Sequence, residues 1–347
     1  MSPRAFITGI QGPVLTTEER AFLREAAPWG LILFKRNVES PQQVKALTAD
    51  FRAAVGRADA PVLVDQEGGR VQRLAPPHWP AYPPGAIYAK LFESDPAAGV
   101  AAARLGARLI AADLIDVGID VDCLPLADVP VSGSHSVIGN RAYGNTAAQV
   151  AVIAAAVAQG LLDGGVLPVL KHLPGHGRAE ADSHERLPVV ATDRATLEAT
   201  DFAAFRPLAS LPLGMTAHVV YTAIDPVEPA TTSRTVLDAV VRGFIGFDGA
   251  LMSDDVSMNA LSGTIASRCR AAFAAGCDLA LHCNGKRDEM MAVAAEAPVL
   301  GGDALRRANA ALAARNSPQP LDRKDAWARF SAMIAPVTRA ADSMPTV

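Results

Sequence analysis

The chain has 347 residues, of which 50% are hydrophobic and 20% charged, so it holds enough apolar material for a large core and is not mainly disordered. Its 32 basic and 36 acidic residues give a net charge of -4, which leaves no electrostatic footprint for nucleic acid or an anionic membrane. The length fits either two ordinary domains or one large barrel. We expect its partners to be small or neutral molecules.

The N-terminal segment predicts a cytoplasmic protein. Residues 1–20 reach charged positions before any apolar run long enough for a signal peptide. The longest aliphatic stretch, residues 150–158, is about half of what a membrane-spanning helix needs. No CxxC spacing occurs among the four cysteines, which we interpret as reduced packing residues: Cys123, Cys269, Cys277 and Cys283.

Eight short apolar runs bounded by turn residues predict eight β-strands. In chain order these runs are residues 5–7, 30–34, 61–64, 119–124, 166–170, 213–216, 250–253 and 279–282. Stretches with helical periodicity lie between them, at residues 16–25, 41–55, 97–117, 147–163, 194–207, 233–242, 260–275 and 287–295. Capping signals support several of these helices, for example Ser40 followed by Pro41.

Mostly apolar strands that alternate with helices indicate a parallel sheet covered by helices. Eight such pairs over this length favour a single-domain (β/α)8 TIM barrel, with a doubly wound sheet as the second possibility. We expect the barrel in residues 1–300 and a C-terminal helical cover of the same domain in residues 301–347, frayed over residues 342–347.

Polar residues follow the ends of the predicted strands, where active sites of such barrels are assembled. They are Asp65, Asp128, Lys171, His172, His218, Asp254, Asp255 and Asn284. Asp65 belongs to the first of three motifs, VDQEGGRVQR, in which a carboxylate is followed by two glycines and two arginines. These groups can surround a neutral polyol such as a sugar, although a solvated turn with surface charges has the same pattern.

The second group is the loop KHLPGHG, which continues to DSH, and it holds three of the seven histidines. Histidines titrate near neutral pH and serve as acids and bases, and a nearby carboxylate orients the ring. Asp182 and His184 are two residues apart, so an extended backbone places both side chains on one face. His176 could instead satisfy loop backbone. Clustered His and Asp could also bind zinc, but the early HxH motif of barrel metallohydrolases is missing.

The third group is SDDVSM, where two carboxylates end an apolar strand. Carboxylates at such a position are costly unless they are paired or functional, so one of them could act as a nucleophile. Asp255 could equally cap the helix that follows. Arg141 lies in IGNRAYG and could bind a substrate hydroxyl, whereas His218 is typical of a core histidine.

In their order and separation, these motifs resemble glycoside hydrolase family 3, specifically its single-domain bacterial β-N-acetylglucosaminidases of the NagZ type. The likeness runs over residues 30–284. It implies a retaining enzyme without metal or other cofactor, with Asp254 as nucleophile, His184 as general acid/base and Asp182 as partner of that histidine. It also implies that the hydroxyls and the acetamido group of the sugar are bound by Asp65, Arg70, Arg141, Lys171 and His172.

The resemblance implies a small amino-sugar substrate and no particular oligomeric state. The substrate would be a muropeptide fragment, N-acetylglucosamine linked to 1,6-anhydro-N-acetylmuramic acid, cleaved during peptidoglycan recycling in support of cell-wall growth, shape and division. Some relatives release the sugar to phosphate instead of water, and a metal-dependent barrel hydrolase is a further alternative. Residues 178–181 and Leu173 depart from the family pattern. The related β-glucosidases carry a second domain, which we do not expect in this protein.

Overall fold

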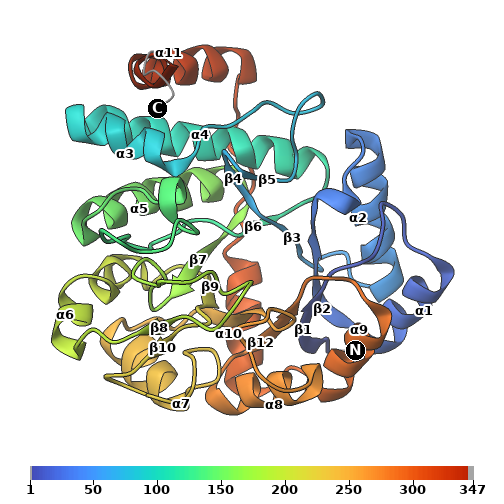
Figure 1. Ribbon diagram of the computed structural model, residues 1–347. Helices are drawn as coiled ribbons and strands as arrows, with labels where there is room; N and C mark the ends of the chain where they lie inside the picture. The colour runs from blue at the N-terminus through green and yellow to red at the C-terminus, as the bar shows by residue number, and fades with distance from the viewer. Residues whose placement is uncertain (1, 343–347) are drawn as a thin grey trace.

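The computed structural model describes residues 2–342 and contains a closed barrel of eight parallel strands (Figure 1). The barrel strands are β1 (Arg4–Thr8), β2 (Pro28–Leu33), β3 (Val62–Val64), β6 (Val121–Asp122), β7 (Leu167–Leu173), β9 (Leu213–Thr216), β11 (Ala250–Asp255) and β12 (Leu279–His282). Each pairs with the next, and β12 pairs with β1. The predicted (β/α)8 barrel is therefore confirmed, and the doubly wound sheet is excluded because that sheet would leave two open edges.

Alternating side chains of each strand enter two different cores, as the two-residue period of a strand requires. On β3, Leu63 belongs to the core inside the barrel, whereas Val62 and Val64 pack outward against the helices. α10 (Gly302–Ala313) contributes Ala308 and Ala311 to the inner core, together with residues at the starts of strands. This helix therefore closes the amino end of the barrel and leaves the carboxyl end open.

Eight predicted helices are present around the barrel, with three changes of extent. They are α1 (Thr17–Ala26), α2 (Pro41–Val55), α4 (Pro96–Asp116), α5 (Ala147–Asp163), α6 (Arg194–Ala199), α7 (Arg234–Val236), α8 (Ile265–Ala275) and α9 (Arg287–Glu296). The expected helix at 194–207 ends early and continues as 3-10 turns, and α7 continues as a π-helix over Leu237–Phe244. α8 starts at Ile265, later than expected, because the Thr264 side chain caps it there.

Two further helices cover one side of the barrel. α3 (Gly85–Ser94), which the sequence did not indicate, packs against α4 and against α11 (Arg323–Asp342), at the top of Figure 1. The rings of Tyr88 and Phe330 lie 6.4 Å apart in this contact. α10 and α11 occupy the predicted C-terminal cover, whose frayed end lies outside the described residues except for Asp342, the last residue of α11. None of the described helices is long and apolar enough to cross a membrane.

Two small sheets accompany the barrel. β4 (Gln66–Gly68) and β5 (Val71–Gln72) form an antiparallel hairpin directly after β3. β8 (Val189–Val190) and β10 (Val220–Tyr221) pair in parallel, and both belong to long connections that follow β7 and β9. Both sheets lie in segments that leave the carboxyl ends of barrel strands, where they shape the surroundings of the opening.

Candidate active site

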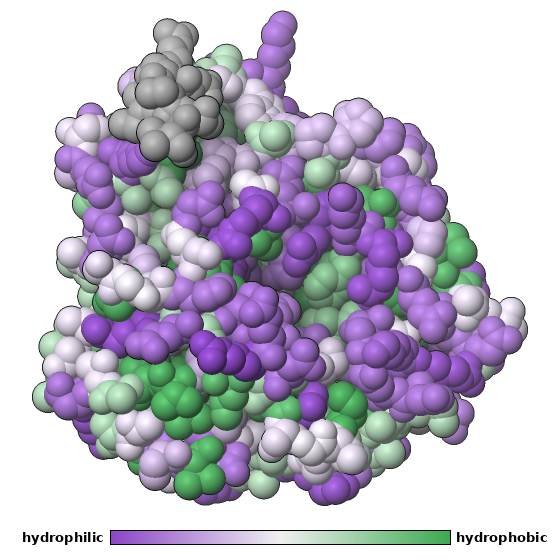
Figure 2. Space-filling view, viewed as in Figure 1, coloured by the Kyte–Doolittle hydropathy of each residue, from purple (hydrophilic) through white to green (hydrophobic). Residues whose placement is uncertain are grey.

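A cavity opens at the carboxyl ends of the barrel strands. Figure 2 shows hydrophilic side chains gathered across the centre of this face around a hollow. The cavity has a volume of about 770 Å³ including its mouth, within the range of small-molecule sites. Its polar and charged lining comes from several strands and the segments after them: Asp65, Arg73, Arg141, Lys171, His172, His176, Ser183, His184, Asp254 and Asp255.

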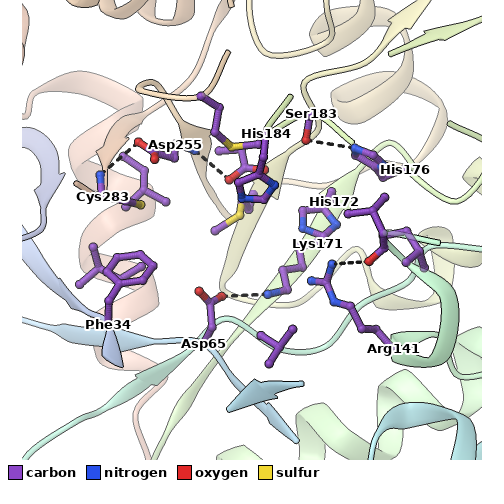
Figure 3. Close-up of a pocket in the computed structure, with 18 of the residues that line it drawn as sticks. Phe34, Asp65, Arg141, Lys171, His172, His176, Ser183, His184, Asp255 and Cys283 are labelled. Carbon is purple, nitrogen blue, oxygen red and sulfur yellow. Dashed lines mark hydrogen bonds and ion pairs between the residues drawn. The ribbon is translucent and has the colours of Figure 1, made fainter. Parts of the chain in front are cut away.

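A buried network of opposite charges lies at the floor of this cavity, and Figure 3 shows its Asp65–Lys171 pair. The Nζ atom of Lys171, at the end of β7, lies 2.7 Å from Oε1 of Glu67 and 3.0 Å from Oδ1 of Asp65. Arg141 donates two hydrogen bonds to Glu67, of 2.8 and 2.7 Å. Arg73 donates to Oδ2 of Asp65 over 3.0 Å. Two carboxylates therefore hold three cations in fixed positions.

Asp65, Glu67 and Lys171 of this network stay charged. Burial would raise the carboxyl pKa values, but Lys171 and the arginines outweigh burial and lower the pKa of Asp65, and that of Glu67 to about 2. Burial would lower the pKa of Lys171, but the two carboxylates outweigh it and raise the value. Because the opposite charges largely cancel, the network presents a ligand with oriented hydrogen-bond donors and acceptors.

The hairpin after β3 brings Arg73 into the cavity and directs Arg70 elsewhere. Because Gln66 pairs with Gln72, the chain folds back and returns Arg73 to Asp65. Arg70 lies near the tip of the hairpin, outside the described lining of the cavity. Its Nη2 atom donates over 2.9, 2.6 and 3.3 Å to the backbone carbonyls of Ser136, Val137 and Ile138. The structure thus does not bring Arg70 together with the other predicted sugar-binding residues.

The buried Asp128 holds two histidines of the cavity lining in place, His172 and His176. Burial opposes its ionisation, but His172 and the backbone N–H of His176 outweigh burial and lower the pKa of Asp128 to about 2. An ionised carboxylate only accepts hydrogen bonds, so Nδ1 of His172, 2.7 Å from Asp128, carries the proton. His172 consequently presents Nε2 as its remaining ring nitrogen. The buried His176 lines the cavity, and its Nε2 atom bonds the hydroxyl of Ser183 over 3.3 Å and not the loop backbone.

The two aspartates at the end of β11 differ in their surroundings. Asp254 lines the cavity, and burial would raise its pKa, but His218, His172 and the backbone N–H of Asp255 lower it, so the carboxylate is ionised. Asp255 accepts hydrogen bonds from the backbone N–H and hydroxyl of Ser257, of 3.0 and 2.7 Å. It also accepts one of 3.1 Å from the backbone N–H of Cys283. Asp255 therefore stabilises the turn after the strand, whereas the carboxylate of Asp254 accepts a 2.8 Å hydrogen bond from the backbone N–H of Asp255 and lines the cavity.

His184 and Asp182 form a hydrogen-bonded pair on the loop after β7. One oxygen of Asp182 accepts from the backbone N–H of His184 over 2.9 Å and pairs with its Nδ1 over 2.8 Å. Burial would raise the pKa of Asp182, but the two hydrogen bonds with His184 outweigh burial and lower it. The His184 side chain is 71% exposed and lines the cavity that contains Asp254. Since Nδ1 donates to the carboxylate, Nε2 is the nitrogen available for proton exchange.

Three residues of this site received no individual role from the sequence: Glu67, Arg73 and Asp128. A signal for Glu67 exists, since Asp65 and Glu67 are two apart and share one face of an extended segment. His218, expected to be a core histidine, is buried and bonds Thr231 over 2.7 Å and the Asp255 carbonyl over 3.0 Å. Among residues 2–342, no group of three His, Cys, Asp or Glu side chains could hold a metal ion.

Comparison with known proteins agrees with this geometry. The family described as glycosyl hydrolase family 3 N terminal domain matches residues 10–303. A β-hexosaminidase of Alkalilimnicola ehrlichii is 41% identical over 280 residues, which cover 80% of this chain and 79% of that protein. A β-hexosaminidase of Pseudomonas aeruginosa is 40% identical over 291 residues, with coverage of 82% and 84%.

A solved structure extends the likeness to the whole barrel. The crystal structure of NagZ from Neisseria gonorrhoeae in complex with N-trifluoroacetyl-D-glucosamine matches with a TM-score of 0.84 and 34% identity. It covers 97% of this chain and 98% of that one. The resemblance inferred from the motifs is thereby confirmed. The chain belongs to glycosyl hydrolase family 3.

Proposed function

We propose that the protein is a retaining β-N-acetylglucosaminidase in which Asp254 is the nucleophile and His184, paired with Asp182, is the acid/base. Its enzyme class is that of the β-N-acetylhexosaminidases among the glycoside hydrolases, as family and relatives indicate. One observation carries the mechanism: an ionised carboxylate and an imidazole hydrogen-bonded to a second carboxylate line the same cavity. Double displacement at a sugar carbon needs a nucleophilic carboxylate and a group that donates and then accepts a proton, and this pair can fill both roles.

In the first half of the reaction, the carboxylate of Asp254 attacks the anomeric carbon and the bond to the leaving oxygen breaks. His184 gives its Nε2 proton to that oxygen, so the leaving group departs as an alcohol. Asp182 fixes the orientation of the ring through its hydrogen bond with Nδ1. The product of this step is a glycosyl ester on Asp254.

In the second half, water attacks the anomeric carbon and the ester bond to Asp254 breaks. The now neutral His184 accepts the proton of the water, which restores both groups. A neutral base beside a departing carboxylate avoids the repulsion that two carboxylates would have. This advantage gives a physical reason for histidine in a role that carboxylic acids usually take.

The cavity floor fits an uncharged amino sugar. Asp65, Lys171, His172 and Arg141 would bind the hydroxyls and the acetamido group, because their charges are mutually compensated and their donors and acceptors are directed. For Arg70 we propose an indirect role, since it holds the backbone of Val137 and Ile138, which line the cavity. In this proposal Arg73, and not Arg70, contacts the sugar directly.

The natural substrate we propose is N-acetylglucosamine β-linked to 1,6-anhydro-N-acetylmuramic acid, with or without peptide, cleaved in the cytoplasm during peptidoglycan recycling. The motifs that resemble the bacterial enzymes support this choice, and the ligand in the Neisseria NagZ crystal, an N-acylated glucosamine, supports amino-sugar specificity. We also propose that residues 1–300 form the catalytic barrel and that residues 301–347 form a helical cover of the same domain.

Trapping the intermediate tests the mechanism. A fluorinated N-acetylglucosaminyl donor that slows deglycosylation should leave a covalent sugar on the enzyme, and mass spectrometry of the digested protein should place it on Asp254. Asp254→Asn is the matched control and should carry no adduct while remaining folded. An adduct on another residue, or normal turnover by Asp254→Asn, would overturn the assignment.

Product analysis separates hydrolysis from transfer to phosphate. The disaccharide substrate should yield free N-acetylglucosamine at the same rate with and without inorganic phosphate, and chelators should not change that rate. Formation of the sugar 1-phosphate would instead make the protein a phosphorylase, and inactivation by chelators would favour a metal-dependent hydrolase.

A further inference from the structure

The loop that carries His184, residues 174–188, is anchored on two sides. On one side the backbone N–H of His176 donates to the buried Asp128 over 2.6 Å. On the other side the loop contacts the turn that follows β11. There the backbone N–H of Ala260 donates to the Ser183 carbonyl over 3.2 Å, and Nδ2 of Asn259 donates to the His184 carbonyl over 3.0 Å.

The turn that carries Asn259 is itself firmly held. Asp255 bonds the backbone N–H and hydroxyl of Ser257, as described above. Arg268 on α8 donates through Nη1 to the carbonyls of Val256 and Met258, over 2.9 and 3.1 Å. The turn is continuous with the end of β11, which carries Asp254. Asn259 therefore reaches the acid/base loop from a support that is fixed relative to the nucleophile.

His184 needs such support from outside its own loop. Its side chain is 71% exposed, and its ring bonds Asp182, which belongs to the same loop. Within residues 2–342, Asn259 provides the hydrogen bond that connects His184 with another element. A retaining enzyme must keep its acid within reach of the leaving oxygen while the nucleophile faces the anomeric carbon, at a separation of about 5 Å between the two groups in most families.

We propose that Asn259 is a positioning residue, which holds the acid/base loop in register with the nucleophile through its hydrogen bond to the His184 carbonyl. The inference rests on the proposed roles of Asp254 and His184. Loss of the bond leaves both chemical groups intact and lowers the fraction of molecules in which His184 lies close to the leaving oxygen. The cost therefore falls on proton donation and not on nucleophilic attack.

Asn259→Ala tests this by the leaving-group dependence of kcat/KM, which reports the glycosylation step. For an N-acetylglucosaminide with a poor leaving group, such as phenyl, kcat/KM should fall by about two- to tenfold, the effect of one hydrogen bond. With a dinitrophenyl leaving group, which needs no proton, kcat/KM should stay at the wild-type value. Asn259→Gln retains an amide donor and should recover part of the loss.

Ser262→Ala is the matched control, because Ser262 is an exposed polar residue of the same connection and should leave both substrates unaffected. Equal losses of Asn259→Ala on both substrates, or no loss on either, would overturn the positioning role. His184→Ala is measured in parallel and must show the same leaving-group dependence, more strongly. If His184→Ala lacks it, the proposed acid/base fails; if only Asn259→Ala lacks it, the positioning role alone fails.

Discussion

Lys171 is 2% exposed and nevertheless charged, which makes it the most informative single residue of the site. Removing an ammonium group from water is costly unless partners compensate for the lost hydration. Asp65 and Glu67 provide this compensation at 3.0 and 2.7 Å. Glu67 also binds Arg141, so one buried carboxylate orients two of the proposed sugar-binding cations. The site is therefore organised before any substrate arrives.

Glu67→Gln should accordingly damage both stability and substrate binding. The change removes a negative charge between two buried cations, and we expect a loss of about 3 kcal/mol in the free energy of unfolding. KM for N-acetylglucosaminides should rise because Lys171 and Arg141 lose their common anchor. Urea unfolding and steady-state kinetics check both effects. Glu93→Gln, an exposed change of the same charge on α3, serves as control, and equal behaviour of the two variants would contradict the argument.

The motifs and their family resemblance pointed to Asp254, His184 and Asp182, whose roles stay predictions, but they did not indicate that Arg73, and not Arg70, lies against Asp65. The first three stand out because a carboxylate ends an apolar strand and because Asp and His are two residues apart in a glycine-rich loop. The two arginines are equivalent in the motif, and only the register of the β4–β5 hairpin returns Arg73 to Asp65. Such register depends on pairing that local pattern does not specify.

At the scale of elements, most barrel strands were predictable because they are short, mostly apolar runs between turn residues, whereas the run at residues 119–124 is interrupted by Asp120 and Asp122. β7 and β11 extend beyond their predicted ends to Leu173 and Asp255, so the functional residues belong to the strands themselves. α3 was not predicted because Pro84 precedes it, Pro96 follows it and no side chain caps its start. Its stability comes from packing against α4 and α11, which is tertiary information.

The acid/base loop also depends on close packing at Gly177. A Cβ added there would collide with the backbone of Val129, on the connection after β6. Gly177→Ala should therefore displace the loop, with a loss on the order of 1–3 kcal/mol in stability and a lower kcat/KM for substrates with poor leaving groups. Thermal unfolding and the same substrate pair measure both effects.

Gly12→Ala is a suitable control for that substitution, because a Cβ at Gly12 meets no atom within 4 Å. It should leave stability and turnover close to the wild-type values. Wild-type behaviour of Gly177→Ala would mean that the loop can move away from Val129 without consequence for His184.

At the scale of the whole molecule, the barrel has one apolar end and one polar end. α10 closes the amino end with alanine side chains, whereas the carboxyl end holds buried carboxylates and histidines whose charge states are fixed by their surroundings. Groups whose pKa values differ between the folded and unfolded chain make stability depend on pH. The polar end should therefore determine how the protein responds to acid.

Between pH 7 and pH 5, His176 should lower the free energy of unfolding by a defined amount, whereas the buried Asp122, whose pKa burial raises well above its usual value, acts in the opposite direction. Burial, helped by nearby His172, lowers the pKa of His176 to about 4, whereas an unperturbed histidine titrates near about 6.5. In this interval the unfolded chain takes up a proton that the folded chain does not. Acid therefore favours unfolding, by about 2 kcal/mol at pH 5 from this residue. The buried His218, whose pKa is also lowered, acts in the same direction.

Urea unfolding of the wild type and of His176→Gln at the two pH values separates this contribution from the others. The variant should lose less stability than the wild type, whatever its absolute value at pH 7, whereas the exposed His78→Gln should lose as much as the wild type. Glu67 and Asp128, both with a pKa of about 2, are stabilising when ionised. That contribution decreases mainly below their unfolded-state values near about 4, so they do not account for the change above pH 5. Equal losses in His176→Gln and the wild type would show that the buried imidazole takes up its proton without cost.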